Sequence, residues 1–247
     1  MTLRLAGLFA DASALWRRER ALVVPVAGVF FLLPSLGMLL LATPFFPELA
    51  NLPDQAALLD FYDRFVQANM VPLALAYFAL DYGTFALLSL YLNGNGRTLG
   101  QVLALSLRRL FPFLLLELAT GAGFRLGLML FVVPGLFVYA RTWLAAPAYA
   151  AKPEGGLVDA LRQGWARSAG LNGLLFLLVT AILFIAGLAL MVVGTIVSGL
   201  IGSALGGGVA ADALGFLVLS LVGALVWSAL AILRVAAYRA TEPRQGM

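Results

Sequence analysis

The most constraining feature of this sequence is an uncharged run from Ala21 to Ala42, directly preceded by Arg17, Arg18 and Arg20. The hydrocarbon core of a bilayer is about 30 Å thick, so a helix needs about 20 apolar residues to cross it. The run is long enough, and a basic cluster beside a span is typical of its cytoplasmic end. Comparable runs follow along the chain. The sequence therefore predicts an all-α, polytopic membrane helix bundle.

The composition supports the same class. Apolar residues make up 62% of the 247 residues and charged residues only 11%, whereas a soluble domain has about 25% charged residues. A water-soluble fold of this length could not bury so much apolar surface. We therefore expect one integral membrane domain over residues 1–247.

About six spans are predicted, together with short interfacial helices. The spans are 21–42, 70–92, 111–132, 136–151, 171–198 and 213–234. Apolar residues from Leu5 to Trp16 recur at helical spacing, so residues 1–20 are predicted as an amphipathic helix on the bilayer surface. A short acidic helix is expected within 43–69. Pro134-Gly135 is predicted as a tight turn, and Gly199 to Gly208 as a glycine-rich loop.

Charge predicts the orientation. With six spans and a cytoplasmic N-terminus, Arg64 is the one basic residue on the outer side, as the positive-inside rule requires. A five-span arrangement without 136–151 would put Lys152, Arg162 and Arg167 outside, so we reject it. The charge bias predicts that both termini are cytoplasmic. The scarcity of lysine fits a GC-rich bacterial genome, so we expect the inner membrane of a bacterium. The basic side chains expected to bind anionic lipid headgroups are Arg17, Arg18, Arg108, Arg109, Arg162 and Arg167.

This bias also explains the pI near 9.8, so no nucleic-acid partner is predicted. Three short basic amphipathic segments, 3–20, 97–110 and 156–168, each precede a pair of spans. They could be a parallel internal repeat, or simply the basic inner loops of any hairpin-built membrane protein. Both interpretations remain open at the level of sequence.

Four charged residues lie inside the predicted spans: Asp81, Glu117, Arg125 and Arg141. An unpaired charge costs about 2.5–3.5 kcal/mol at the bilayer centre, so partners are expected. By 1.5 Å of rise per residue, both arginines lie roughly 10 Å from the outer face and Asp81 roughly 15 Å. These depths allow an Asp81–Arg141 or an Asp81–Arg125 pair. Glu117 lies nearer the inner face, within reach of Arg108, Arg109 or Arg234. The four charges are either structural ion pairs or a polar site for an ion, a proton or a lipid headgroup.

Known enzyme signatures are absent from the sequence. There is no histidine and no cysteine, which removes the commonest general base, the commonest metal ligand and thiolate sites. One embedded aspartate is too few for an aspartyl intramembrane protease. No enzyme activity, metal or cofactor is therefore predicted. Gly123-x-x-x-Gly127 is read as close internal helix packing rather than as a dimer face.

Residues 130–175 carry an apolar Pro134-Gly135 turn, a span with Arg141, and an amphipathic segment with Trp165 before another long span. This stretch, with residues 98–116, resembles the signature of the glycerophosphoryl diester phosphodiesterase membrane-domain family. Other matching positions are Pro147, Asp159, Ala160, Leu161 and Arg167. The resemblance implies a bacterial multi-span membrane module. Some members also carry a soluble phosphodiesterase domain, which this sequence lacks, so the resemblance implies no activity.

Two functions are compatible with these features. The first is a non-enzymatic membrane-embedded accessory or scaffold protein that contacts lipid, a membrane-protein partner or a second copy of itself. The alternative is a small transporter or lipid-handling protein with a midplane polar site around Asp81, Arg125 and Arg141. A dry, packed ion pair would favour the scaffold, and a polar cavity around these three residues, open to one side, would favour the transporter.

Overall fold

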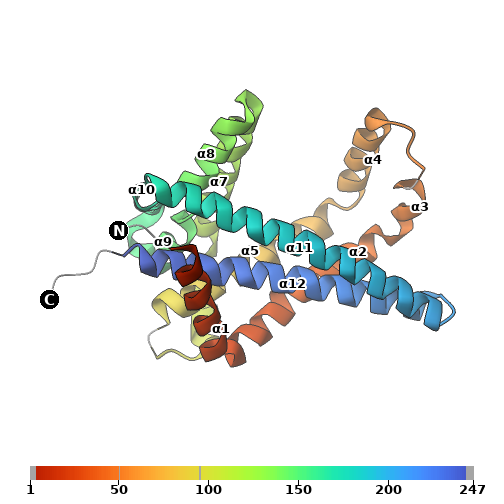
Figure 1. The fold of residues 1–247 in the computed structure, drawn as a ribbon, viewed down its shortest axis with the longest axis horizontal. Coiled ribbons are helices and arrows are strands. Elements are labelled where there is room, and N and C mark those ends of the chain that lie inside the picture. Colours follow the sequence, from red (N-terminus) through yellow and green to blue (C-terminus); the bar gives the residue numbers. More distant parts are fainter. Residues whose placement is uncertain (1–3, 50, 95, 243–247) are drawn as a thin grey trace.

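The computed structural model describes residues 4–49, 51–94 and 96–242, and these residues form helices without any strand. Five helical segments are long and apolar enough to cross a membrane, which confirms an all-α, multi-pass membrane protein (Figure 1). The first half contains α1 (Leu5–Ala27), α2 (Leu33–Ala42), α3 (Phe46–Leu49), α4 (Gln55–Ala68), α5 (Met70–Asn93) and α6 (Leu99–Arg108). The second half contains α7 (Leu110–Leu130), α8 (Val132–Thr142), α9 (Ala145–Ala151), α10 (Gly156–Arg167), α11 (Leu171–Ala204) and α12 (Val209–Ala240).

The predicted break between an interfacial helix, 1–20, and a first span is wrong. Helix α1 passes through that boundary to Ala27, and a π-helix, Gly28–Leu32, joins it to α2, so that Leu5–Leu49 is one helical run. The π-helix lies just before Pro34, whose missing N–H and bulky ring disturb the normal hydrogen-bond ladder. Figure 1 shows the dark-red start of this run and its later orange part pointing in different directions.

Prolines lie just after several of the other helix breaks. Pro72, Pro112 and Pro134 each occupy the third position of a helix, and the preceding helix ends four residues earlier, at Ala68, Arg108 and Leu130 respectively. A proline ring clashes with the carbonyl four residues before it, which favours a helix end at that point, although α1 continues through Pro25. The predicted turn at Pro134-Gly135 is therefore displaced: the break is at Phe131, with extended backbone (φ −172°, ψ 159°), and Pro134 lies in the first turn of α8.

The predicted fourth span, 136–151, is not one helix. It is divided into α8 and α9 by a turn at Trp143 and Leu144. The cause is again a proline: Pro147 lies in the first turn of α9, and its ring clashes with a helical carbonyl at residue 143. Helix α9 is almost fully buried. Together, α8 and α9 lead the chain back along α7, because Tyr139 lies beside Phe124 and Tyr149 donates a hydrogen bond to the Arg109 carbonyl (3.4 Å).

Helices α11 and α12 are longer than predicted, with 34 and 32 residues. The predicted loop Gly199–Gly208 is helical up to Ala204, and the turn is confined to Leu205–Gly208, where three glycines have φ between +72° and +91°. An isolated glycine costs a helix about 1 kcal/mol. The 34-residue α11 nevertheless stays helical through Gly199 and Gly202, because each helical residue keeps its peptide group hydrogen-bonded within the chain.

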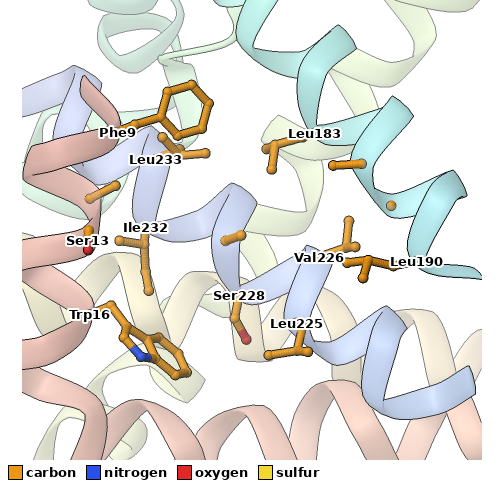
Figure 2. A pocket seen from close by; sticks show the side chains of 14 residues that line it. Phe9, Ser13, Trp16, Leu183, Leu190, Leu225, Val226, Ser228, Ile232 and Leu233 are labelled. Atoms are coloured by element: carbon orange, nitrogen blue, oxygen red, sulfur yellow. The ribbon is translucent and has the colours of Figure 1, made fainter. Parts of the chain in front are cut away.

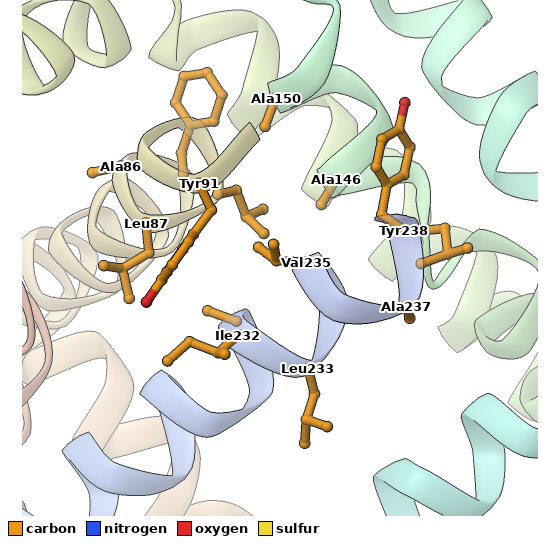
Figure 3. Close-up of a cluster of buried hydrophobic side chains, with 14 of the residues drawn as sticks. Ala86, Leu87, Tyr91, Ala146, Ala150, Ile232, Leu233, Val235, Ala237 and Tyr238 are labelled. Atoms are coloured by element: carbon orange, nitrogen blue, oxygen red, sulfur yellow. The ribbon is translucent and has the colours of Figure 1, made fainter. Parts of the chain in front are cut away.

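One end of the bundle holds the start of α1, the C-terminal ends of α5 and α12, and helices α6, α9 and α10; we call it the basic end. Tyr91 of α5 donates to the Leu15 carbonyl (3.3 Å), and Arg239 of α12 donates to the Tyr91 carbonyl. Figure 3 shows Tyr91 together with Ala146 and Val235 from α9 and α12. The many alanines at this hub allow the helix backbones to approach closely. The two ends of the described chain therefore lie at the same end of the bundle.

The hairpin of α7 and α8 is held by a glycine contact. A Cβ at Gly127 would lie 2.7 Å from the Gly135 Cα, and a Cβ at Gly123 would lie 3.3 Å from a methyl of Val138. The predicted role of Gly123 and Gly127 in internal packing is confirmed.

We expect Gly127→Ala to force α7 and α8 apart, because the added methyl meets backbone that has no room to move. Overpacking of this kind costs about 1–3 kcal/mol and would lower the melting temperature in detergent by roughly 2–10 °C. Gly121→Ala on the same helix is the matched control, because nothing lies within 4 Å of its new Cβ. Equal melting temperatures of the two variants would contradict the close-packed hairpin.

Candidate functional site

Glu117 of α7 and Arg234 of α12 form the embedded ion pair. Their closest nitrogen and oxygen atoms are 4.0 Å apart, and their side chains are 29% and 14% exposed, respectively. The half-buried Asp81 of α5 lies within electrostatic range of both. The cluster thus joins three helices far apart in sequence and holds two acidic groups against one guanidinium. Of the three arginines predicted as possible partners of Glu117, Arg234 is the one that pairs with it.

A cavity of about 140 Å³ lies beside this pair, between α7, α8, α9 and α12. Its polar lining comes from Glu117, Thr120, Tyr139, Thr142 and Arg234. The guanidinium of Arg234 lies 5.9 Å from the centre of the Trp143 ring, which also lines the cavity. Within the described part of the chain, Nε of Arg234 and Nε1 of Trp143 are buried without a hydrogen-bond partner. Two side chains of the cavity lining thus each keep one buried nitrogen without a hydrogen-bond partner.

The predicted pairs of Asp81 with Arg141 or Arg125 are wrong: among the described residues, no ion pair joins them. The guanidinium of Arg141 lies instead 4.7 Å from the centre of the Trp165 ring on α10. It also lies 5.9 Å from the ring centre of Phe137, one turn earlier on α8. A cation held over aromatic faces is stabilised by the ring quadrupole without an acidic partner. Arg125 is exposed on α7. The three residues of the predicted midplane site are thus separated by the fold.

The predicted headgroup-binding arginines fall into two groups. Arg17, Arg18, Arg108 and Arg162 are exposed, although Arg18 also pairs with Glu19 at 3.4 Å. Two others have structural contacts, since Arg109 lies 3.9 Å from Glu154 and Arg167 donates to the Tyr238 carbonyl at 3.4 Å. The Arg167 guanidinium also lies 4.1 Å from the centre of the Tyr238 ring. Arg167 is therefore fixed to the end of α12 and is less available to lipid.

An apolar groove of about 390 Å³ lies between α1, α11 and α12. Figure 2 shows Phe9 and Trp16 of α1 on one side of it, and Leu183 and Leu190 of α11 on the other. Ser13 and Ser228 are the polar side chains in its lining, and the Ser13 hydroxyl accepts a hydrogen bond from Arg17 (3.2 Å). The groove therefore has an apolar floor and a guanidinium at its rim.

Sequence reasoning missed the groove because three helices from both ends of the chain form it. The nearest sequence signal is the pair of small residues Ala186 and Gly187 on α11, where α12 approaches closely: a Cβ at Gly187 would lie 3.1 Å from a methyl of Val226. The positions on which the family resemblance rests have separate structural roles. The fold brings Arg141 and Trp165 into contact, while Pro134 and Gly135 shape the hairpin. Among the described residues, no group of acidic side chains could hold a metal ion.

Comparisons with protein families, curated proteins and solved structures find no match for this chain. The resemblance to the glycerophosphoryl diester phosphodiesterase membrane-domain family therefore stays a prediction.

We expect Arg234→Met to destabilise the protein strongly, because it leaves the embedded carboxylate of Glu117 without its cation. Removing one partner of a buried ion pair costs about 3–5 kcal/mol; at the low end of that range the melting temperature falls by roughly 5–10 °C. Arg141→Met keeps its packing on Trp165 and should lower it less. If Arg141→Met proves the more damaging change in a thermal-unfolding assay, the assignment of Arg234 as the structural cation is wrong.

Proposed function

We propose that this protein is a non-enzymatic accessory or scaffold protein of a bacterial inner membrane, and that it binds phospholipid in the groove between α1, α11 and α12. The observation that carries the proposal is the combination of an apolar groove with Arg17 at its rim. An acyl chain suits the apolar floor, and a guanidinium recognises a phosphate through several parallel hydrogen bonds. The volume of about 390 Å³ is within the usual range for small-molecule sites.

The distribution of charge supports the orientation that this function needs. Exposed arginines of α1, α6 and α10 gather at the basic end, where the start of α1 and the end of α12 also meet. Each basic side chain near an anionic surface contributes about 1 kcal/mol to membrane attraction. A cytoplasmic basic end places both termini in the cytoplasm and Arg17 at the level of the inner-leaflet phosphates.

Filling the groove should remove the bound lipid. Ala186 lines the groove and Ala181 lies elsewhere on α11, and both are exposed. We expect phospholipid to co-purify with the unchanged protein in mild detergent, as measured by native mass spectrometry. Ala186→Phe should lose this phospholipid. Ala181→Phe should retain it.

Arg17→Gln should weaken the preference for phosphatidylglycerol over phosphatidylethanolamine when lipid is added back. Arg4→Gln, a second exposed arginine of the N-terminal region, is the control. Equal lipid retention by Ala186→Phe and Ala181→Phe would refute the groove as the lipid site.

A second function, transport of a proton or small cation, is favoured by the cavity beside Glu117 and Arg234. Two carboxyl groups against one guanidinium give the cluster a net negative charge when all three are ionised. Embedded acidic groups of this kind are typical of proton and ion pathways in membranes. An anion is disfavoured by the same charge balance.

Ion flux into proteoliposomes separates the two functions. A transporter should pass protons or Na⁺ down an imposed gradient, and Glu117→Gln should abolish the flux because it removes the embedded charge. Asp60→Asn, an exposed change on α4, should leave it unaltered. Absence of flux in the unchanged protein would leave the ion pair with a structural role.

A further inference from the structure

The hairpin of α7 and α8 ends in a tip that no other part of the described chain covers. Its exposed fractions are 82% for Met129, 77% for Phe131 and 73% for Val133. No polar side chain occurs anywhere from Leu126 to Val138. A turn in water normally carries polar residues, as the turn region near Ser203 and Asp212 does. The tip is therefore built for contact with hydrocarbon.

The hairpin leaves the bundle close to its base. Helix α8 contacts α11 through Tyr139 with Thr180 (3.4 Å between hydroxyls), and Trp143, directly after α8, stacks on Phe176 of α11 (4.7 Å between ring centres). Farther along α11, Phe184 is 71% exposed, so the two helices do not continue side by side. Figure 1 shows the green α7–α8 pair projecting at a steep angle to α11 and α12.

The backbone at the tip is compatible with a position inside the hydrocarbon layer. Phe131 is the one residue between the two helices that is not helical. Its N–H donates to the Gly127 carbonyl (3.0 Å) and its carbonyl accepts from Gly135 (3.3 Å), while Pro134 has no N–H to satisfy. Irregular backbone in a bilayer is costly because each unpaired peptide group lacks a partner, and these two hydrogen bonds reduce that cost at the turn.

The charges of the hairpin indicate its depth. Arg141 at the base of α8 is held against Trp165 of the amphipathic helix α10, and tryptophan is enriched at the membrane–water interface. Arg125 is exposed on α7 without an ion pair in the described structure. A hairpin inclined toward the membrane plane lets the long side chain of Arg125 extend to the headgroups.

We propose that α7 and α8 form a re-entrant hairpin that enters the bilayer from the basic end, inserts its Met129–Val133 tip among the acyl chains, and does not reach the opposite face. The occupant of this apolar surface is lipid hydrocarbon. Four segments then cross the membrane: the run Leu5–Leu49, α5, α11 and α12. An even number of crossings keeps the start of α1 and the end of α12 on one side, as their contacts require, whereas five crossings would separate them.

The absence of cysteine makes a direct test possible. Single-cysteine variants would carry Phe131→Cys or Val133→Cys at the tip, Ala104→Cys on α6, and Ser203→Cys beside the α11–α12 turn. All four positions are exposed, so the changes should not disturb packing. A membrane-impermeant maleimide is applied to right-side-out and to inverted vesicles. The two control positions should react from opposite sides, and the tip positions from neither side until the membrane is dissolved in denaturing detergent.

Depth and self-association are measured on the same variants. A bimane label at residue 131 or 133 should be quenched by lipids brominated within their acyl chains. Labelling of the tip from the same side as Ser203→Cys would overturn the proposal in favour of an upright crossing. Labelling from the same side as Ala104→Cys would overturn it in favour of a hairpin in water. A protected tip without quenching, combined with Phe131→Cys crosslinking between copies, would identify a dimer contact instead.

Discussion

The fold depends on one constraint, which is that peptide groups in hydrocarbon must find hydrogen-bond partners within the protein. In accordance with this constraint, α11 satisfies its own peptide groups over 34 residues, and its turn is confined to Leu205–Gly208. The constraint also explains why prolines control the architecture. A proline in the first turn of α5, α7 or α8 clashes with the carbonyl four residues earlier, and the preceding helix ends at that residue.

The embedded charges are stabilised in two different ways. Glu117 and Arg234 neutralise each other between α7 and α12, with Asp81 close by, and this contact ties the hairpin base to the bundle. Arg141 has no acidic partner and packs on Trp165 instead. An ion pair fixes two helices relative to each other, whereas a cation–π contact lets the arginine lie at the polar edge of the membrane. The first contact is thus a structural link, and the second indicates depth.

The basic end combines dense packing with exposed apolar surface. Alanine-rich packing of α5, α9 and α12 and the hydrogen bonds of Tyr91 make a rigid hub there. The groove behind α1 and the α7–α8 hairpin both extend from this hub into regions that the protein itself does not fill. A rigid centre with two lipid-exposed apolar features is the arrangement that a lipid-contacting accessory protein requires.

The sequence by itself determined the membrane class, the approximate positions of α4, α5, α6, α7 and α10, and the identity of the residues that must find partners in the membrane. Hydropathy, helical periodicity and basic clusters are local properties, and lipid makes them decisive because only helices are permitted there. The tertiary structure alone decided that Asp81 belongs with Glu117 and Arg234, that Arg141 packs on Trp165, and that α1, α11 and α12 enclose a groove. These outcomes depend on how each helix is rotated and how the helices cross. Side-chain packing between distant segments sets both, and counting depth along a single span gives no information about either.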